Sequence, residues 1–491
     1  MWLRPAVRGD GGMIPLPLAE LAAACGGRQE VADPSFVATR VTTDSRTVRP
    51  GDVFVGLRGE RFDGDEFARA ALDAGAAAVV VRPATAAALG DDASCIVVDD
   101  GLAALAALAT AVRRRSSARV VAITGSTGKT STKDILAALL RPLTGVVATR
   151  GNYNNEIGVP LTMLDLEIDS EVLVCELAMR GRGQVGELAR LVDPDIGVIT
   201  NIAPVHLELV GTVEEVAAAK AEIICGVGQG ALVVPVDEAL LEPHLRLHTG
   251  RLITFGGERG DVRVISAEQR GFETRALVDA FGRRASFEFN FSGDHYLQDA
   301  LAAVAAFLAL GYGIDDAKAG AREVVFSELR GELAELVGGG LLLNDSYNAN
   351  PLSMRAALDH LVAVAGRRPR VAVLGDMYEL GDEAARYHRE VGEYAAAVGV
   401  RVAAIGDLAR DYLVGTVDEL WFASVEECVT ALPGVVTPGS AVLVKASRAL
   451  RLERVAEAVV ALHGLAGNAA GGGKEGAGAA GRAGERNADR A

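Results

Sequence analysis

The chain has 491 residues, which is too long for one ordinary hydrophobic core and suggests about three domains. Half of the residues are hydrophobic and 23% are charged, so the composition predicts a globular protein rather than a disordered one. The 49 basic and 65 acidic residues give a formal charge of -16. This charge opposes non-specific binding to nucleic acid or to an anionic membrane.

The compartment can be inferred from the N-terminal segment and the cysteines. Residues 1–12 lack the apolar core of a signal peptide, and no apolar stretch is long enough to span a bilayer. A second methionine, Met13, opens a helix-like run, so the true start is either Met1 or Met13. The five cysteines form no CxxC pair, and we expect reduced core residues of a cytoplasmic protein. They are Cys25, Cys95, Cys175, Cys225 and Cys428.

The first unit is predicted to span residues 13–115. Helix-like Ala/Leu stretches alternate there with short apolar runs at 78–81 and 95–98, which is typical of a small α/β unit. The charged, Ser-rich segment 112–118 is expected to act as a linker to the next unit.

The central unit is predicted to span residues 116–326. Its apolar runs at 119–124, 171–177 and 195–201 are long enough for strands buried on both faces, with helical segments between them. This alternation predicts a doubly wound, mostly parallel sheet. The segment 251–291 has short, alternating, Gly-punctuated runs, which indicate antiparallel additions to that sheet.

A third unit, Rossmann-like, is predicted for residues 327–463, so the fold class is α/β with three domains. Its expected strands lie near residues 341–345, 370–376, 401–407 and 441–447. Residues 464–491 are rich in Ala, Gly and Arg without periodicity, and we expect a disordered tail because such a segment cannot offset its chain entropy by burial.

A phosphate-binding loop follows the apolar run 119–124. Glycines in such a loop let backbone N–H groups turn inward, and the following helix contributes positive potential. Lys129 can neutralise phosphates and Thr130 can hold magnesium. A plain Gly-rich turn is the alternative, but strand, lysine, hydroxyl and helix all coincide. The expected nucleotide-binding residues are Gly125, Ser126, Thr127, Gly128, Lys129, Thr130 and Ser131.

The form of this loop introduces a family resemblance. Ile123 stands where the common loop has its first glycine, which leaves the compact G-x-x-G-K-T form. That form resembles the Mur ligases and their folylpolyglutamate synthetase relatives. From Met13 to about His463, further motifs resemble the Mur branch that adds D-alanyl-D-alanine. They are T-D-S-R at 43–46, P-G-D-V-F at 50–54, F-D-G at 62–64, the Asn-rich segment 149–158, N-D-S-Y-N-A-N-P at 344–351 and L-G-D-M-Y-E-L-G at 374–381.

The resemblance implies an ATP-dependent ligase of peptidoglycan precursor synthesis. Such an enzyme joins D-alanyl-D-alanine to UDP-N-acetylmuramoyl-tripeptide through an acyl phosphate, with ATP and two magnesium ions as cofactors. The expected protein is a cytoplasmic monomer that binds no nucleic acid. Whether the third residue of the tripeptide is lysine or diaminopimelate stays open.

The resemblance also assigns residues to the ligands. Ser45 and Arg46 would lie at the uridine diphosphate end of the substrate, while His295, Arg330 and Asp345 would reach the nucleotide. The remaining substrate residues are Asn152, Asn154 and Asn155 in the Asn-rich loop, and Asn348 and Asn350 near the incoming dipeptide.

A catalytic metal site is the last implication of the resemblance. Glu176 ends a predicted strand, where α/β sheets bind ligands, and with Thr130, His206 and Lys220 it would hold magnesium beside the catalytic Lys129. Taken alone, His206 is more often structural and Lys220 more often a solvated lysine on a helix face. The family carries a carbamylated lysine at position 220, and that modification replaces a cation by a carboxylate-like group.

The chain departs from the family pattern in two places. Tyr296 and Asp299 stand where asparagines are usual, which leaves the adenine contacts open, and Ala446 stands where the third-domain pattern has glycine. Two rival functions remain: another ligase of the same superfamily, and a regulatory ATPase that binds a partner. The D-S-Y-N-A-N-P motif argues against the first, and the set Glu176, His206 and Lys220 argues against the second.

Overall fold

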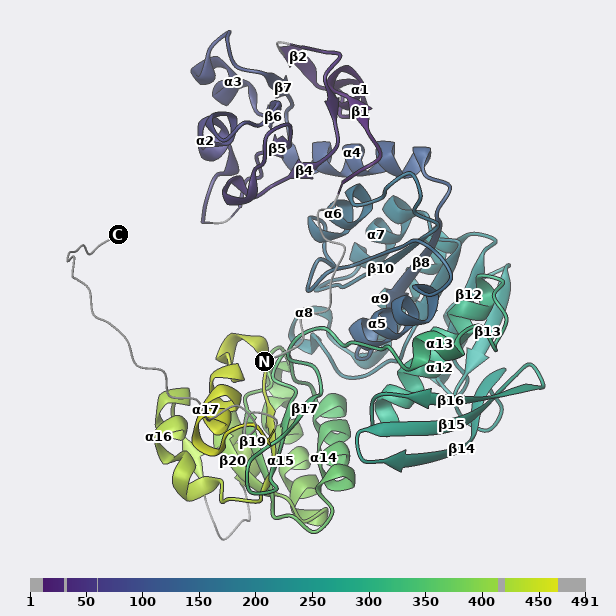
Figure 1. Cartoon of the computed structure of the whole chain (residues 1–491), viewed down its shortest axis with the longest axis vertical. Coiled ribbons are helices and arrows are strands. Elements are labelled where there is room, and N and C mark those ends of the chain that lie inside the picture. The colour runs from purple at the N-terminus through teal and green to yellow at the C-terminus, as the bar shows by residue number, and fades with distance from the viewer. Residues whose placement is uncertain (1–11, 31–32, 60, 414–419, 467–491) are drawn as a thin grey trace, which may run out of the picture.

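The computed structural model describes residues 12–30, 33–59, 61–413 and 420–466. Three α/β parts follow one another along the chain, each built around its own sheet: N-terminal at the top of Figure 1, central on the right, and third at the lower left. Residues 1–11 and most of the predicted tail, from residue 467, lie outside the described residues. None of the helices in the described ranges is long and apolar enough to cross a membrane.

The N-terminal part contains a five-stranded sheet of order β2-β7-β6-β5-β4, in which β2 and β7 are antiparallel and the other pairs are parallel. The apolar runs predicted at 78–81 and 95–98 are confirmed as strands. The strands are β2 (Arg28–Glu30), β4 (Val41–Thr42), β5 (Val53–Val55), β6 (Ala78–Val81) and β7 (Cys95–Val97), beside a separate pair, β1 (Leu16–Pro17) and β3 (Val37–Ala38). The helices are α1 (Leu18–Ala24), α2 (Ala68–Asp73), α3 (Pro83–Leu89) and α4 (Gly101–Arg115).

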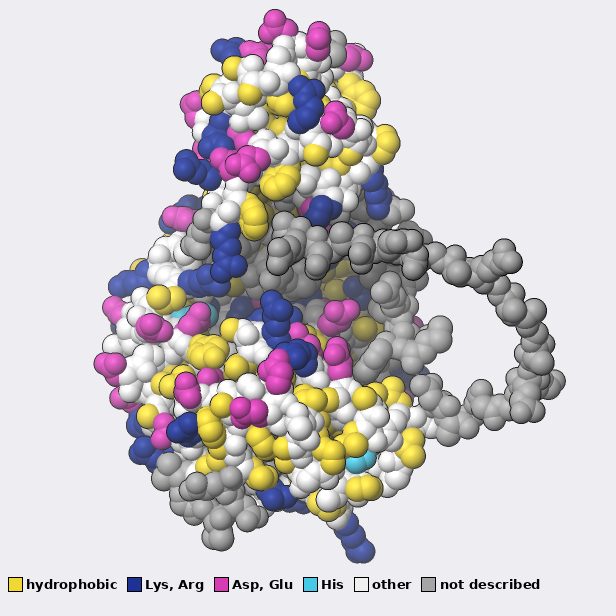
Figure 2. Space-filling view, turned by 90° about the vertical axis from the view of Figure 1, so that its left-hand side faces the viewer, with side chains coloured by type: hydrophobic (Ala, Val, Ile, Leu, Met, Phe, Trp, Pro, Cys, Tyr) yellow, Lys and Arg dark blue, Asp and Glu magenta, His cyan; other side chains and the backbone are white. Residues whose placement is uncertain are grey.

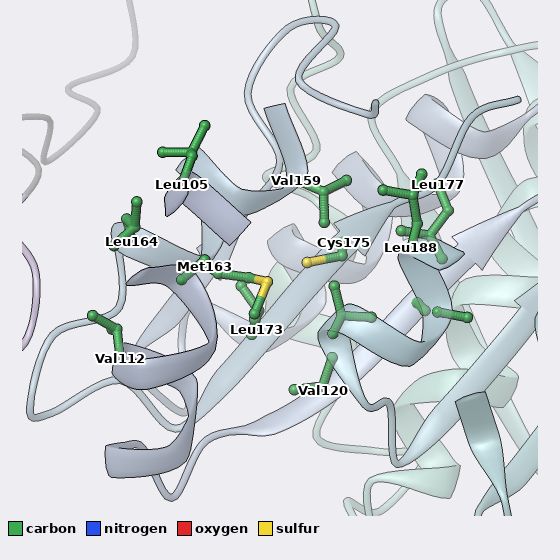
Figure 3. Packing of buried hydrophobic residues seen from close by; sticks show 14 of the residues in the cluster. Leu105, Val112, Val120, Val159, Met163, Leu164, Leu173, Cys175, Leu177 and Leu188 are labelled. Atoms are coloured by element: carbon green, nitrogen blue, oxygen red, sulfur yellow. The ribbon is translucent and has the colours of Figure 1, made fainter. Parts of the chain in front are cut away.

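Helix α4 connects the N-terminal and central parts. The linker predicted at 112–118 is wrong in its first half, because α4 continues to Arg115 and Val112 is fully buried. Asp100 caps the start of the helix by accepting from Leu102 N at 2.8 Å, and the arginines of the last turn favour the negative end of the helix dipole. Residues of α4 and α6 (Gly158–Leu164) belong to one apolar cluster (Figure 3), so the first two parts share a core.

The central part holds a nine-stranded sheet of order β16-β15-β14-β13-β12-β11-β8-β10-β9. Pairs from β9 through β14 are parallel, which confirms the predicted doubly wound sheet, and β14 to β16 are antiparallel as expected. The prediction for 251–291 is wrong only for β13, which pairs in parallel on both sides.

Two apolar clusters cover the two faces of this central sheet. The strands are β8 (Arg119–Thr124), β9 (Val146–Ala148), β10 (Val172–Glu176), β11 (Ile196–Ile199), β12 (Ala231–Pro235), β13 (Arg251–Phe255), β14 (Val262–Arg270), β15 (Glu273–Ala280) and β16 (Arg283–Phe289). The helices besides α6 are α5 (Lys129–Leu140), α7 (Gln184–Val192), α8 (Leu207–Val210), α9 (Val213–Ala221), α10 (Ile224–Val227), α11 (Glu242–Leu245), α12 (Asp294–Ala309) and α13 (Lys318–Ala321).

The third part has a six-stranded sheet of order β17-β18-β22-β19-β20-β21, parallel except for the pair β17 and β18. All four predicted strands are confirmed, and the two edge strands β17 and β21 were not predicted. The strands are β17 (Glu332–Glu335), β18 (Leu341–Asn344), β19 (Arg370–Gly375), β20 (Arg401–Ile405), β21 (Trp421–Phe422) and β22 (Ala441–Lys445). The helices are α14 (Pro351–Ala365), α15 (Ala384–Ala397), α16 (Val425–Val435) and α17 (Glu453–His463).

Two sequence expectations need correction outside the sheets. Cys95, Cys175 and Cys428 are buried, but Cys25 is only half-buried and Cys225 is exposed, so the expectation of five core cysteines is wrong for these two. The structured part of the chain continues beyond His463, since Leu465 bridges to Leu336 and packs against the third-part core.

Candidate active site

The phosphate loop lies between β8 and α5, at the carboxyl edge of the central sheet. Gly125 and Gly128 have φ values of 147° and 75°, which side chains rarely tolerate. A Cβ on Gly128 would lie 2.1 Å from a carboxylate oxygen of Asp299, so this close approach also requires glycine. Lys129 begins α5 and donates to the carbonyl of Gly125 at 2.7 Å, which holds its ammonium against the loop.

Residues after β11 fix the shape of the loop. Asn201 accepts from Thr127 N at 2.9 Å and donates to its hydroxyl at 2.8 Å. Ser126 donates from its hydroxyl to the carbonyl of Ala203 at 3.1 Å and accepts from Ala203 N at 2.9 Å. These contacts make the loop a preformed turn. Sequence reasoning missed Asn201 because no local signal links the end of one strand to the loop after another.

Glu176 is buried at the end of β10 and joins two predicted segments of the site. It accepts from the hydroxyl of Thr130 at 2.7 Å and from the side-chain amide of Asn154 at 2.8 Å. Burial would raise the pKa of Glu176, but the positive charges of Lys129 and Arg330 outweigh it and hold that pKa below its ordinary value. The carboxylate is therefore ionised at neutral pH and faces the start of the phosphate-loop helix.

Lys220 lies near the end of α9, and only 1% of its surface is exposed. The solvated-lysine interpretation is therefore wrong. Within the described ranges, its ammonium has no hydrogen-bond acceptor and no ion-pair partner. Burial lowers the pKa of Lys220 well below its ordinary value, and the charge of Lys129 adds to the effect. The environment thus favours an uncharged amine.

His206 is bonded to the third part of the chain. Among the described residues, no group of three or more His, Cys, Asp or Glu side chains is arranged to hold a metal ion. Instead, Nδ1 of His206 is hydrogen bonded to the carboxylate of Glu379, in the L-G-D-M-Y-E-L-G segment of the third part. His206 and Glu379 have positive φ values, 54° and 65°, which are uncommon for residues other than glycine. The contact therefore joins two residues that both have a left-handed backbone conformation.

Asp299 and Tyr296, which stand where the family pattern has asparagines, occupy different places. Asp299 is buried beneath the phosphate loop and accepts from the hydroxyl of Ser131 at 2.5 Å. Burial raises the pKa of Asp299 to about 7. Tyr296 stacks on Phe326 with ring centroids 4.4 Å apart, at the connection to the third part. His295, beside it, packs against His360 at 5.7 Å, and burial lowers the pKa of His295 to about 3.

The D-S-Y-N-A-N-P loop follows β18 and is held by Lys445 at the end of β22. The Lys445 ammonium donates to the Asp345 carboxylate at 2.5 Å and to the carbonyl of Asn348 at 2.9 Å. Arg330 lies over the ring of Tyr347, 4.1 Å from its centroid. Asn350 has a structural role: its side chain caps α14 by accepting from Ser353 N at 2.9 Å.

The remaining predicted residues lie nearer the surface. Arg46 is exposed and forms a bidentate pair with Asp44, with both N–O distances 2.8 Å, and Ser45 begins the short 3-10 turn beside it. Asn155 accepts from Gly158 N at 2.9 Å at the start of α6, and Asn152 is exposed. On the face shown in Figure 2, Lys and Arg side chains gather at the narrow region below the N-terminal part, which suits an anionic ligand.

A preformed phosphate loop, a buried ionised carboxylate and a third α/β part beside them define a nucleotide-dependent enzyme of the ligase class. Family models match most of the described chain. They are the Mur ligase family catalytic domain at residues 38–113, the Mur ligase middle domain at 123–307 and the Mur ligase glutamate ligase domain at 330–448.

Curated relatives match over nearly their full length. The UDP-N-acetylmuramoyl-tripeptide--D-alanyl-D-alanine ligase of Bacillus subtilis (strain 168) is 34% identical, covering 88% of this chain and 95% of the relative. The enzyme of the same name from Escherichia coli (strain K12) is also 34% identical and covers 91% and 99%. The chain belongs to the Mur ligase family, whose members are ATP-dependent, peptide-bond-forming ligases.

Solved structures agree with this assignment. A crystal structure of MurF from Acinetobacter baumannii has a TM-score of 0.83 at 30% identity and covers 91% of this chain and 98% of that one. The MurF ligase of Thermotoga maritima in complex with ADP has a TM-score of 0.75 at 31% identity, covering 85% and 96%. The three-domain fold is therefore shared with MurF enzymes.

Proposed function

We propose that the protein is the cytoplasmic ligase that uses ATP to join D-alanyl-D-alanine to UDP-N-acetylmuramoyl-tripeptide in peptidoglycan precursor synthesis. Relatives that carry this activity in their names support the proposal. The structural observation that carries it is the position of Arg330. This residue stacks on Tyr347 of the third-domain loop, while its charge acts on Glu176 and Lys129 at the phosphate loop.

The chemistry follows from the need to activate a carboxylate in water. A carboxylate oxygen of the tripeptide attacks the γ-phosphoryl group of ATP, ADP leaves, and an acyl phosphate forms. The amine of D-alanyl-D-alanine then attacks the acyl carbon, and phosphate leaves with the original carboxylate oxygen. Lys129 neutralises charge on the transferring group, and the protein contributes chiefly by positioning three ligands between three domains.

The site suits magnesium at one position. The hydroxyl of Thr130 and the carboxylate of Glu176, 2.7 Å apart, are oxygen donors of the kind that this ion prefers. When bound, the ion supplies positive charge that stabilises the phosphates. His206 belongs to a proposed second position, because its bond to Glu379 directs Nδ1 to a carboxylate and leaves Nε2 available, as in many metal-binding histidines.

Lys220 is proposed to be carbamylated. An uncharged amine can attack carbon dioxide; the N–C bond forms, a proton leaves to solvent, and the product is an anionic carbamate. Burial and the absence of an ion-pair partner within the described ranges support this proposal, because burial and the charge of Lys129 outweigh the negative charges of Glu176 and Glu222 and disfavour a bare ammonium there.

The other assignments stay proposals. His295, Arg330 and Asp345 serve the nucleotide, and Ser45 and Arg46 serve the uridine diphosphate end. The substrate residues are Asn152, Asn154, Asn155 and Asn348, and Asn350 contributes by fixing the start of α14. Domain boundaries are proposed at 13–115, 116–326 and 327–463, the last extended to Leu465, in a monomer that binds no nucleic acid.

Phosphate release under substrate omission tests the function. We expect release from ATP only when the UDP-muramoyl tripeptide and D-alanyl-D-alanine are both present. Turnover with a different amine, such as a single amino acid, would indicate another ligase of the superfamily. Hydrolysis that ignores both substrates would indicate a regulatory ATPase.

A further inference from the structure

A buried ion pair lies on the phosphate-loop helix, one turn after Lys129. Lys133 is only 3% exposed, and its ammonium lies 2.7 Å from the carboxylate of Asp134. It also donates to the carbonyl of Thr149, at the start of the Asn-rich loop, at 2.8 Å. A lysine is rarely buried unless it is paired, because removing its charge from water is costly. A buried lysine on α5 therefore indicates a structural role.

The pair also holds the connection to the third domain. The backbone N–H of Ser327 donates to the second carboxylate oxygen of Asp134 at 2.8 Å, and the Lys133 ammonium donates to the Ser327 hydroxyl at 3.3 Å. Phe326, just before, stacks on Tyr296 of α12. The chain is therefore attached to the central domain up to residue 327.

Beyond Ser327 the hydrogen bonds are formed with third-domain residues, although Gly331 still packs against Tyr296 of α12. Leu329 N donates to the Glu332 carboxylate at 2.9 Å, and the carbonyl of Leu329 accepts from Tyr347 N at 3.1 Å. Leu329 and Gly331 have φ values of 64° and 59°, which mark a sharp change of chain direction. The change of hydrogen-bond partner thus occurs within residues 327–329, and this segment is called the interdomain pivot below.

Arg330 follows this pivot directly, and its charge acts on Lys129 and Glu176 at the phosphate loop. We propose that Lys133 and Asp134 are positioning residues that anchor the interdomain pivot on the phosphate-loop helix, so that Arg330 meets the nucleotide at a fixed place relative to Lys129. The rigid first turns of α5 connect Lys129 to this anchor. The inference rests on the proposed function for its turnover readout.

Two variants separate positioning from folding. Asp134→Asn keeps an oxygen that can accept from Ser327 N but removes the charge opposite Lys133. The double variant Lys133→Met with Asp134→Leu removes both charges, so no unpaired charge remains buried. The matched control is Asp315→Asn, which breaks an ion pair with Lys318 of the same N–O distance, 2.7 Å, on the surface of the central domain.

We expect Asp134→Asn to bind ADP as the wild type does in calorimetry while kcat falls at least about tenfold, because small misplacements of a charged group are costly. The double variant should have the melting temperature of the wild type but the reduced kcat of Asp134→Asn. The control Asp315→Asn should match the wild type in both quantities. Small-angle scattering of the ADP complex, which needs no turnover, should show a larger radius of gyration for Asp134→Asn than for the wild type.

Three results would contradict the proposal that Lys133 and Asp134 anchor the interdomain pivot. They are an unchanged kcat with unchanged scattering, a loss of ADP binding in step with kcat, and recovery of both stability and kcat in the double variant. A wild type that turns over no substrate counts against the proposed function instead, and the scattering comparison then decides the anchor alone.

Discussion

His206 of the central domain and Glu379 of the third domain are hydrogen bonded across the domain boundary, through Nδ1 and a carboxylate oxygen. The neighbouring backbone follows the same contact, since Glu208 N donates to the carbonyl of Glu379 at 3.3 Å. The hydrogen bond to His206 is the chief cause of the lowered pKa of Glu379. It outweighs the partial burial of Glu379, which acts to raise that pKa. The third domain therefore fixes the ring orientation of a proposed metal-binding histidine.

We predict that Glu379→Gln raises the magnesium concentration needed for half-maximal activity by about tenfold or more, the usual cost of losing the partner of a metal-binding histidine. The control is Glu383→Gln, since Glu383 pairs with Arg386 on the surface. A magnesium titration of initial rates checks this. Equal magnesium requirements for the wild type and both variants would show that the His206 contact serves only domain packing.

Lys220→Ala should fold but be nearly inactive, because it removes the proposed carbamate from a buried position. Small carboxylic acids at high concentration should restore part of the activity by occupying the vacated place, whereas Lys220→Arg should resist rescue because its guanidinium fills the space with the wrong charge. Initial rates with and without acetate provide the measurement. A near-wild-type rate for Lys220→Ala would exclude the carbamate.

Asp299 should give stability a distinct pH dependence. Burial raises the pKa of its carboxyl to about 7, so the folded state keeps a proton that the unfolded chain releases above its ordinary pKa. Stability contributed by this proton is present at low pH and is lost as pH rises toward 7. Asp299→Asn should therefore become more stable than the wild type, by up to a few kcal/mol above pH 7 and by little near pH 4.

Denaturant unfolding of wild type and Asp299→Asn at several pH values checks this prediction, with the exposed Asp73→Asn as control. A stability difference between wild type and Asp299→Asn that does not change between about pH 4 and 8 would mean that Asp299 is ionised in the folded protein.

Lys129→Ala should abolish ligation and leave the fold intact. Among the described residues, its ammonium donates hydrogen bonds only to the carbonyls of Gly125 and Ser126, so the substitution removes charge from the phosphate site without opening a core. The loss of such a contact costs a few kcal/mol in the transition state, so less than about a tenth of the activity should remain. Lys318→Ala, on the surface, serves as control for activity and melting temperature.

Local patterns predicted much of this protein. The phosphate loop is a contiguous signal, and the strands β8, β10 and β11 of the central domain and β18, β19, β20 and β22 of the third are uninterrupted apolar runs, so they could be found from the sequence. The short edge strands β17 and β21 carry no such run. The β13 strand resembled its antiparallel neighbours because a short run of residues does not show whether its partner strands are parallel or antiparallel.

Long-range contacts could not be predicted. Glu379 lies 173 residues from His206, and Ser327 lies 193 residues from Asp134, so no spacing rule connects them. The burial of Lys220 and Lys133 could not be predicted either, because a lysine on a helix is usually solvated. These two lysines are buried only because other parts of the chain pack over them. The side chain of Asn350 also caps the adjoining helix α14, a role that the sequence analysis did not predict.

The most direct test of the proposed reaction follows the carboxylate oxygen of the tripeptide. With that carboxylate labelled by a heavy oxygen isotope, the protein should form the UDP-linked pentapeptide in the presence of ATP and D-alanyl-D-alanine. Mass spectrometry should find one labelled oxygen in each phosphate released, because the acyl phosphate transfers it. Phosphate without label, or ATP consumption without pentapeptide, would contradict the account.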